Sequence, residues 1–247
     1  MRIIGLMIVG PGEADRWLET VLKQRTELVD DMIIATNNAT QKEKDLIKKY
    51  GFWQYEDNRE WGINQPLIKN DLLAKAVKLK PDWFLPSDAD ELYGKAFTRA
   101  EAERLAATDA ISYNFHIINL WGDQNHYRHD LSFENIRYFR FRPELGLSFE
   151  RKNVHCGWSP PAFYTYAWTA PHLVKHYGLM LEKDRKRKVE RYEKYDPKAV
   201  FKGKEFYDKI AEKEIAGRPF IESEMQMRCE RNVQDHYKHQ HLKHVSN

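Results

Sequence analysis

The first third of the chain alternates short apolar runs with segments whose apolar residues recur at helical spacing. The apolar runs cover residues 3–9, 32–36, 52–55 and 83–85, and such compact runs are typical of strands covered on both faces. The segments between them carry Trp17, Leu18, Val21 and Leu22, then Leu46, Ile47 and Tyr50, and then Leu72, Leu73, Ala76 and Val77. This alternation predicts an α/β fold with a mainly parallel sheet flanked by helices.

Capping residues mark the starts of two helices. Thr40 is followed by Glu43, and Thr98 by Glu101, at the spacing of a capping box. In that motif the two side chains satisfy backbone N–H groups that the first helical turn leaves without partners. We therefore expect helices to begin just after residues 40 and 98.

The pattern changes in the second half of the chain. Residues 111–117 alternate apolar and polar side chains, which predicts a half-exposed strand, and residues 136–142 predict another. Residues 182–194 are dense in charge, with three opposite-charge pairs at i,i+4: Glu182–Lys186, Asp184–Lys188 and Glu190–Lys194. That spacing favours a helix whose charged side chains are solvated.

Composition narrows the class of protein. The 247 residues carry a formal net charge of +3, and the basic residues are interleaved with acidic ones, so we expect no nucleic-acid partner. Only Cys156 and Cys229 occur, which argues against a disulfide framework and favours the cytoplasm. The run 3–9 is too short to span a bilayer, and no other stretch is long enough, so we expect no integral membrane segment.

Three carboxylates follow the fourth predicted strand: Asp88, Asp90 and Glu91. In parallel α/β sheets ligands bind at the carboxyl ends of the strands. Crowded carboxylates repel one another unless a cation or hydrogen-bond donors compensate, and Mg²⁺ or Mn²⁺ can bridge such a group to a diphosphate. The alternative is an acidic turn that only caps the next element.

Four stretches of the chain resemble family 2 glycosyltransferases, an inverting class with the GT-A fold: Ile3–Val9, Met32–Asn38, Trp83–Glu91 and His176–Gly178. The resemblance implies a Rossmann-like nucleotide-diphospho-sugar transferase with a mixed sheet. It implies a domain over residues 1–195, with a donor-binding half at about 1–95 and an acceptor half at about 96–180. Residues 196–247 would then form a helical C-terminal extension.

The same resemblance implies where a UDP- or GDP-linked sugar donor would bind. The loop of Pro11, Gly12 and Glu13 and the loop at Asn37 would hold the nucleotide, with Asp88 and Ala89 near the ribose and sugar. Asp90 would bind Mn²⁺ or Mg²⁺, together with Asp88. His176 would close the metal site, because the family often places a histidine in such a segment; His172, four residues earlier, is as consistent with a packed or surface side chain.

The stretch from Asp57 to Lys69 resembles the segment in which the family commonly carries an Arg-Asn pair. This chain has Lys69 followed by Asn70, which keeps the charge but loses the bidentate fork of arginine. The resemblance makes Asp57 and Lys69 candidate donor-binding residues. Lys69 would contact the diphosphate, or it is a solvated helix residue. The basic cluster at 185–188 favours a solvated face over a phosphate contact.

The general base for the acceptor hydroxyl is the least defined part of the prediction. Family members often carry a His-Glu pair after an arginine-rich strand, but here the arginines of residues 137–142 are followed by His155-Cys156. Asp123 and Glu134 remain the candidate catalytic residues, and Asp130 is a further one. Of the aromatic residues, one or two of Trp121, Tyr127, Trp158 and Trp168 would stack on a sugar.

Two other functions fit parts of the pattern. A nucleotidyltransferase would share the α/β half and the metal but would attack the α-phosphate of a triphosphate. A non-catalytic sugar- or nucleotide-binding protein on a transferase scaffold would explain the missing His-Glu acid. The sequence itself leaves the acceptor unknown.

Overall fold

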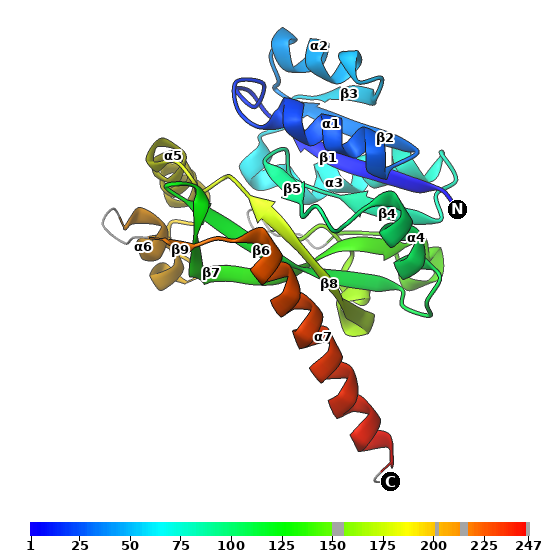
Figure 1. Cartoon of the computed structure of the whole chain (residues 1–247). Coiled ribbons are helices and arrows are strands. Elements are labelled where there is room, and N and C mark those ends of the chain that lie inside the picture. Colours follow the sequence, from blue (N-terminus) through cyan, green and yellow to red (C-terminus); the bar gives the residue numbers. More distant parts are fainter. Residues whose placement is uncertain (150–155, 201–202, 213–216, 246–247) are drawn as a thin grey trace.

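A single mixed β-sheet runs through the molecule (Figure 1). The computed structural model describes residues 1–149, 156–200, 203–212 and 217–245, and it describes side chains up to residue 233. Within these residues the strand order is β3-β2-β1-β4-β7-β6-β8-β5, and the short strand β9 pairs with β7. The predicted α/β class with a mixed sheet flanked by helices is confirmed.

The first half of the sheet is parallel. Strands β1 (Ile3–Val9), β2 (Asp31–Asn37), β3 (Trp53–Asp57) and β4 (Trp83–Pro86) form it, with β1 between β2 and β4. The intervening helices are α1 (Leu18–Leu28), α2 (Gln41–Lys49) and α3 (Trp61–Val77). From β1 the sheet continues to β2 and β3 on one side and to β4 on the other, so the strand order reverses at β1. Parallel α/β sheets bind their ligands at such a point.

Helix α3 begins well before the apolar spacing predicts it. Its first turns carry Gln65 and Lys69, which are buried although polar. With Trp61 and Gly62 they form a stripe at i,i+3/i+4 spacing along one side of the helix. The sequence pattern misses these turns because this stripe faces a cavity rather than the apolar core.

The capping prediction at residue 40 is confirmed and has a second consequence. Thr40 and Glu43 form the capping box of α2. The other Glu43 carboxylate oxygen accepts hydrogen bonds from the backbone N–H of Gly12 at 2.9 Å and of Ala14 at 3.2 Å. One buried carboxylate therefore fixes both the start of α2 and the loop after β1. Thr98 likewise caps α4 (Arg99–Ala106), accepting from the N–H of Glu101.

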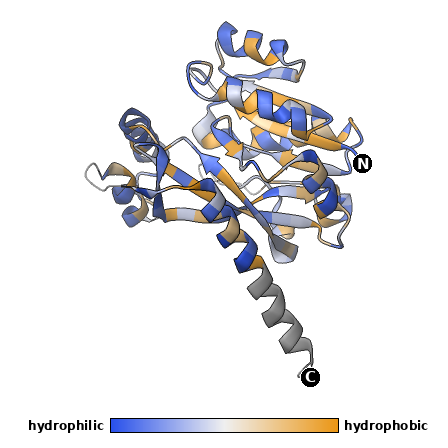
Figure 2. Cartoon of the chain, viewed as in Figure 1, coloured by the Kyte–Doolittle hydropathy of each residue, from blue (hydrophilic) through white to orange (hydrophobic). Residues whose placement is uncertain are grey.

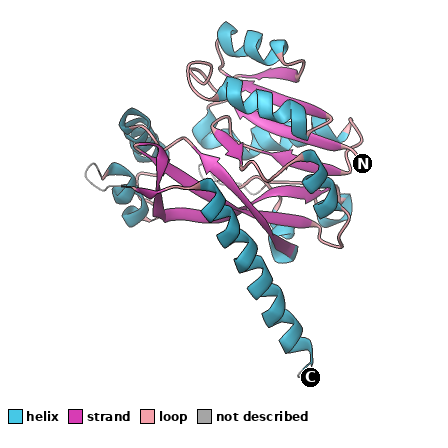
Figure 3. Cartoon of the chain, viewed as in Figure 1, coloured by secondary structure: helices cyan, strands magenta, loops and turns pink. Residues whose placement is uncertain are grey.

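The second half of the sheet is mostly antiparallel and longer than predicted (Figure 3). A long hairpin joins β6 (Ser112–Trp121) to β7 (Asp123–Arg140), and β7 pairs with β4. Strand β8 (Ala167–His176) lies parallel to β6, and β5 (Glu91–Tyr93) pairs antiparallel with β8. The remaining elements are two 3-10 helices (Pro143–Leu145, Pro161–Tyr166), α5 (Glu182–Tyr195), α6 (Lys204–Ala211), β9 (Arg218–Pro219) and α7 (Glu222–Val245).

The core has two layers, one on each face of the sheet. Along β1, Ile3, Met7 and Val9 pack in one cluster, while Ile4 and Leu6 pack in the other. This alternation follows from the two-residue period of a strand and explains why both sets are apolar. The parallel strands are correspondingly hydrophobic in Figure 2, whereas α5 is mostly hydrophilic.

Helix α7 packs against β8 and extends away from the sheet (Figure 1). The predicted domain boundary at residue 195 falls between α5 and α6, and the division itself stays a prediction. In the part of the chain that the structure describes, no helix combines the length and apolarity needed to cross a membrane.

Candidate functional site

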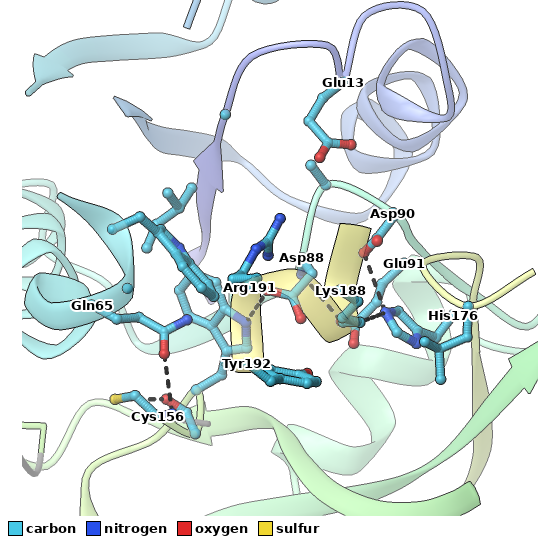
Figure 4. A pocket seen from close by; sticks show the side chains of 18 of the residues that line it. Glu13, Gln65, Asp88, Asp90, Glu91, Cys156, His176, Lys188, Arg191 and Tyr192 are labelled. Atoms are coloured by element: carbon cyan, nitrogen blue, oxygen red, sulfur yellow. Dashed lines mark hydrogen bonds and ion pairs between the residues drawn. The ribbon is translucent and has the colours of Figure 1, made fainter. Parts of the chain in front are cut away.

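A cavity of about 470 Å³ opens at the carboxyl ends of β1, β2 and β4, between α3 and α5 (Figure 4). Its volume lies in the range typical of small-molecule sites. Most of the residues predicted to bind a donor or a metal line it: Pro11, Glu13, Asn37, Lys69, Asp88, Ala89, Asp90 and His176. The structure therefore brings together side chains from both halves of the chain.

Two predicted donor residues support the cavity from outside its lining. Gly12 adopts a φ of 81°, in the left-handed region that favours glycine, so it makes the tight turn after β1. Asp57 is buried and accepts hydrogen bonds from the backbone N–H of Arg59 at 3.0 Å and from its guanidinium. The Asn37 amide in turn donates to the carbonyls of Asp57 and Arg59, which ties this loop to the cavity wall.

The predicted catalytic residues do not reach the cavity. Asp123 is exposed at the turn of the β6–β7 hairpin, where it accepts from the N–H of Asn125 and pairs with His126 at 2.8 Å. Glu134 lies one residue from both Phe133 and Asn135, which line the cavity, so the two-residue period of β7 directs it to the opposite face. Their catalytic roles stay predictions. His155, part of the segment where the family's His-Glu pair was expected, lies outside the described residues.

Within the acidic segment the three carboxylates have different partners. Glu91 is buried and forms a bidentate pair with Arg137, whose Nε and Nη2 lie 2.8 and 2.6 Å from its two oxygens. Asp88 accepts a hydrogen bond from the Trp158 indole N–H at 2.9 Å. Glu91 is therefore a structural partner of Arg137, and Asp88 and Asp90 remain to face a ligand.

The pairing of β5 with β8 brings Asp90 close to His176. Glu91 lies opposite His176 in this antiparallel pair, and Asp90 Oδ1 lies 3.6 Å from His176 Nε2. Gly178 is required here, because a Cβ at that position would overlap with both the Asp90 carboxylate and the His176 ring. The predicted segment His176-Tyr177-Gly178 thus lies directly at the acidic loop.

The tautomer of His176 is set by Asn119. The Asn119 amide N–H donates to the carbonyl of Leu131, so its oxygen faces His176 Nδ1 at 2.5 Å, and Nδ1 must carry the proton. Burial and the nearby Lys188 lower the pKa of His176, which keeps the ring neutral. Its Nε2 lone pair therefore points toward Asp90, as a metal-ligating histidine with a hydrogen-bonded second nitrogen would.

These donors fit a divalent ion only in part. Asp90 and His176 would supply one oxygen and one nitrogen, and Mg²⁺ sites commonly take one or two carboxylates and complete their shell with water and substrate phosphate. Among the described residues, no three histidine, cysteine or acidic side chains are grouped closely enough to hold a metal ion. Metal binding stays a prediction that rests on the Asp90–His176 pair.

Lys69 is buried on α3, where its ammonium makes contacts that the sequence did not indicate. Nζ donates to the carbonyls of Cys156 and Gly157 at 2.6 and 3.0 Å, and it lies 4.0 Å from the centre of the Trp158 ring. The same loop carries the indole that donates to Asp88. Lys69 therefore positions Trp158, and through it Asp88. It is not the solvated residue of the alternative, and its contact with the diphosphate stays a prediction.

Helix α5 contributes one face to the cavity, which corrects the prediction of a fully solvated helix. Only the first of the three i,i+4 pairs forms, Glu182–Lys186 at 3.0 Å. Asp184 instead pairs with Arg16 at 2.8 Å, and Lys188 turns toward His176. Arg187, Lys188, Arg191, Tyr192 and Tyr195 line the cavity. Their i,i+3/i+4 spacing was visible in the sequence, but the dense charge around it favoured solvent.

Solved structures of S. aureus TarS share this architecture. One aligns with 85% of this chain and 42% of the TarS chain, at a TM-score of 0.50 and 9% sequence identity. Structures of TarS 1–349 in complex with UDP and with UDP-GlcNAc each align at a TM-score of 0.50 and 8% identity, over 85% of this chain and 70% of theirs. The chain has a GT-A-type fold.

At this level of identity the likeness concerns the fold. The chain spans less than half the length of the longer TarS chain. No protein-family model matches the sequence, and no curated protein matches it.

The lining of the cavity carries charges of both signs, with a small excess of cations. Among the described lining residues, the five cationic side chains Lys69, Arg137, Arg187, Lys188 and Arg191 outnumber the four carboxylates Glu13, Asp88, Asp90 and Glu91. Burial would raise the pKa of Glu91, but Arg137 overcomes this and holds it below its usual value. The lining is thus suited to an anionic ligand.

Glu13 is a lining carboxyl whose pKa is raised. Burial, followed by the charge of Asp90, raises its pKa to about 7, while Arg16 and Arg187 oppose the rise. Arg16 Nη1 lies 3.3 Å from Glu13, and Arg187 Nη2 lies 3.9 Å from it. A carboxyl that titrates near neutral pH inside a ligand-sized cavity is typical of functional sites.

Sequence reasoning missed several lining residues, chiefly Gln65, Asn119, Asn135 and Arg191. Gln65 accepts from the backbone N–H of Cys156 at 3.1 Å and so fixes the same loop as Lys69. Asn119 and Asn135 lie on strands whose register the sequence does not specify. Only Gln65 and Arg191 carried a signal, since each extends a helical stripe of polar residues.

Proposed function

We propose that this chain transfers a sugar from a nucleotide-diphospho-sugar, most simply a UDP-linked one, to an acceptor. The observation that carries the proposal is the convergence of Asp88, Asp90 and His176 with cationic side chains of α5 at the point where the strand order reverses. The GT-A-type fold, shared with structures of TarS solved with UDP and UDP-GlcNAc, supports it.

The donor would lie with its nucleoside toward the loop after β1 and Asn37. Glu43 holds that loop by two backbone hydrogen bonds, so the nucleoside would meet a pre-formed surface. Asp88 would contact the ribose or the sugar, in the orientation that the Trp158 indole gives it. Asp90 and His176 would hold Mn²⁺ or Mg²⁺, which when bound stabilises the charge of the departing nucleoside diphosphate.

Inversion at the sugar is part of the proposal and rests on the resemblance to family 2 enzymes. It requires a general base near the acceptor, and among the described residues the lining carboxylates lie on the donor side. The acceptor side presents Phe133 and Asn135 instead. This favours, as a second candidate, a non-catalytic protein that binds a nucleotide sugar.

The test is product formation from UDP-GlcNAc with Mn²⁺ and a panel of acceptors. Release of UDP is expected from the wild type, and Asp90→Ala should lower its rate by about a hundredfold or more while the melting temperature stays within a few degrees. Asp45→Ala, on the exposed side of α2, is the matched control and should retain full activity.

The other products distinguish the alternatives. Pyrophosphate released from UTP and a sugar phosphate would instead indicate a nucleotidyltransferase. UDP-GlcNAc binding without turnover over the whole acceptor panel would favour the non-catalytic protein. The anomeric configuration of the product, read by NMR, tests inversion.

A further inference from the structure

Two cations of α5 face the cavity without an acidic partner of their own. Lys188 is half-buried, and its Nζ lies 3.5 Å from His176 Nε2. Arg191 lies with its guanidinium 4.8 Å from the centre of the Trp61 ring. In the described part of the chain, no carboxylate lies within salt-bridge distance of either. We call Lys188 and Arg191 the α5 cations.

Charges withdrawn from water are costly unless they are paired. Asp90 acts electrostatically on both α5 cations without direct contact, while Asp88 and Glu91 act in addition on Lys188 and Glu13 on Arg191. Glu91 is not available, since Arg137 binds both of its oxygens. The α5 cations and the acidic loop line the same cavity, so an anion bound there would lie against the α5 cations.

The position of α5 is fixed at both ends of this face. Near its start, Asp184 pairs with Arg16 at 2.8 Å. At its end, Lys194 and Tyr195 both donate to Glu60 at 2.7 Å, and the Tyr195 ring packs so closely on Gly62 that a Cβ there would overlap with it. The α5 cations are thus held in place before any ligand binds, which lowers the cost of binding.

Lys188 also lies where it would compete with a metal ion. His176 Nε2 offers its lone pair toward both the Asp90 carboxylate, at 3.6 Å, and the Lys188 ammonium, at 3.5 Å. An ion bridging Asp90 and His176 would lie within a few ångströms of the ammonium, and like charges at such distances repel strongly in a cavity. Figure 4 shows Lys188 and Asp90 directed at the same ring.

We propose that the Lys188 ammonium is the cation that binds the ligand's diphosphate in this site. The ammonium stabilises the Asp90–His176 pair before a donor arrives and, with Arg191, binds the diphosphate afterwards, so that a nucleoside diphosphate binds without a divalent ion. The identity of the ligand as a nucleoside diphosphate rests on the proposed function. The competition between Lys188 and a metal ion does not.

The first measurement uses no nucleotide. Mn²⁺ binding to the metal-stripped full chain is followed by electron paramagnetic resonance for the wild type and Lys188→Met. We expect the variant to bind Mn²⁺ about tenfold or more tightly, because a repelling charge is removed. Lys186→Met, on the exposed face of the same helix and 61% exposed, should leave the Mn²⁺ affinity unchanged. Equal Mn²⁺ affinities for Lys188→Met and the wild type would overturn the competition.

The second measurement is calorimetric titration of UDP in EDTA. The wild type should bind UDP, Lys188→Met should bind it about tenfold to a hundredfold more weakly, and Arg191→Gln should lose a comparable factor. Lys188→Arg should recover most of the affinity, which a purely structural role of the methylene chain would not predict. Metal-free UDP binding that is unchanged in Lys188→Met, or a wild type that binds UDP only with Mn²⁺, would overturn the proposal.

The two measurements separate this inference from the proposed function. Tighter Mn²⁺ binding by Lys188→Met with no UDP binding by any form would retain the competition and overturn both the diphosphate contact and the nucleotide-sugar function. Metal-free UDP binding that depends on Lys188, without turnover of UDP-GlcNAc, would retain the inference and favour the non-catalytic alternative.

Discussion

The parallel and antiparallel halves of the sheet contribute lining residues to the same cavity in different ways. The parallel half contributes loops that follow directly on buried strands: residues 10–13 after β1, Asn37 at the end of β2 and residues 88–91 after β4. The antiparallel half contributes side chains from within long strands, such as Asn119 on β6 and Arg137 on β7, and from one face of α5. The contribution of the parallel half depends on where each strand ends. The contribution of the antiparallel half depends on the pairing register of its strands.

In the antiparallel half, the register of the strands decides which individual residues line the cavity. Phe133, Asn135 and Arg137 alternate along β7 and all line the cavity, whereas Glu134 between them does not. A shift of one residue would exchange these faces. We therefore expect the stability of the fold and ligand binding in the cavity to depend more on buried pairs from the antiparallel half than on any one donor loop. Four predictions test this expectation, in order of decreasing effect.

The largest effect is expected at the pair that joins the halves, Arg137 and Glu91. Both side chains are buried, and Arg137→Ala would leave the Glu91 carboxylate without its bidentate partner. We expect a loss of about 3–5 kcal/mol in the free energy of unfolding, measured by urea titration.

The matched control for Arg137 is a pair at the surface. Arg104→Ala breaks the contact with Glu101, where the arginine side chain is 60% exposed, and should cost less than about 1 kcal/mol. Similar losses in the two variants would show that Arg137–Glu91 does not hold the halves together.

This dependence on register also explains how much the sequence predicts. The strands of the parallel half, the capping residues Thr40 and Thr98 and the loop at Asp88–Glu91 were all predicted, because each rests on a local pattern within about ten residues. Lys69 was predicted to lie in the site, but its contacts with the carbonyls of residues 156 and 157 were not predicted, since these residues are distant in sequence. Lys188 was assigned to solvent, because nothing local shows that His176 lies beside it.

The contact between α3 and α5 provides the second prediction. Gly62→Ala places a Cβ where the Tyr195 ring lies, so the end of α5 must shift. Overpacking of this kind costs about 1–3 kcal/mol, and the displaced α5 cations should also bind UDP more weakly in calorimetry.

A second substitution tests whether this loss comes from the clash. Tyr195→Ala in the Gly62→Ala background restores space and should recover part of the lost stability, giving a favourable coupling between the two positions. Strictly additive effects would mean that the close approach does not set the position of α5.

Trp158→Phe tests the link from the loop at 156–158 to the donor side. The variant keeps an aromatic ring beneath the Lys69 ammonium but removes the N–H that donates to Asp88 at 2.9 Å. A hydrogen bond to a charged group is worth about 1.5–3 kcal/mol, so UDP-GlcNAc turnover should fall by about tenfold to a hundredfold. Lys69→Met should also reduce turnover. Unchanged turnover in Trp158→Phe would show that the Trp158 indole does not orient Asp88 for the reaction.

The smallest expected effect is a pH dependence at Glu13, in the donor half. Its pKa is raised from 4.5 to about 7, by burial first and then by Asp90. The carboxyl is therefore largely neutral at pH 6 and negative at pH 8, beside the expected position of the diphosphate. The affinity for UDP-GlcNAc, whose diesterified diphosphate keeps its charge over this range, should rise about threefold to tenfold as the pH falls from 8 to 6.

Glu13→Gln separates this titration from that of other groups. Because the pKa of Glu13 is higher in the folded than in the unfolded state, its contribution to stability is fully present below pH 4.5 and is lost as the pH rises through about 7. Glu13→Gln should flatten both the affinity and the urea-unfolding free energy over that range relative to the wild type. If both pH profiles survive the substitution unchanged, Glu13 is not the group that titrates over this range.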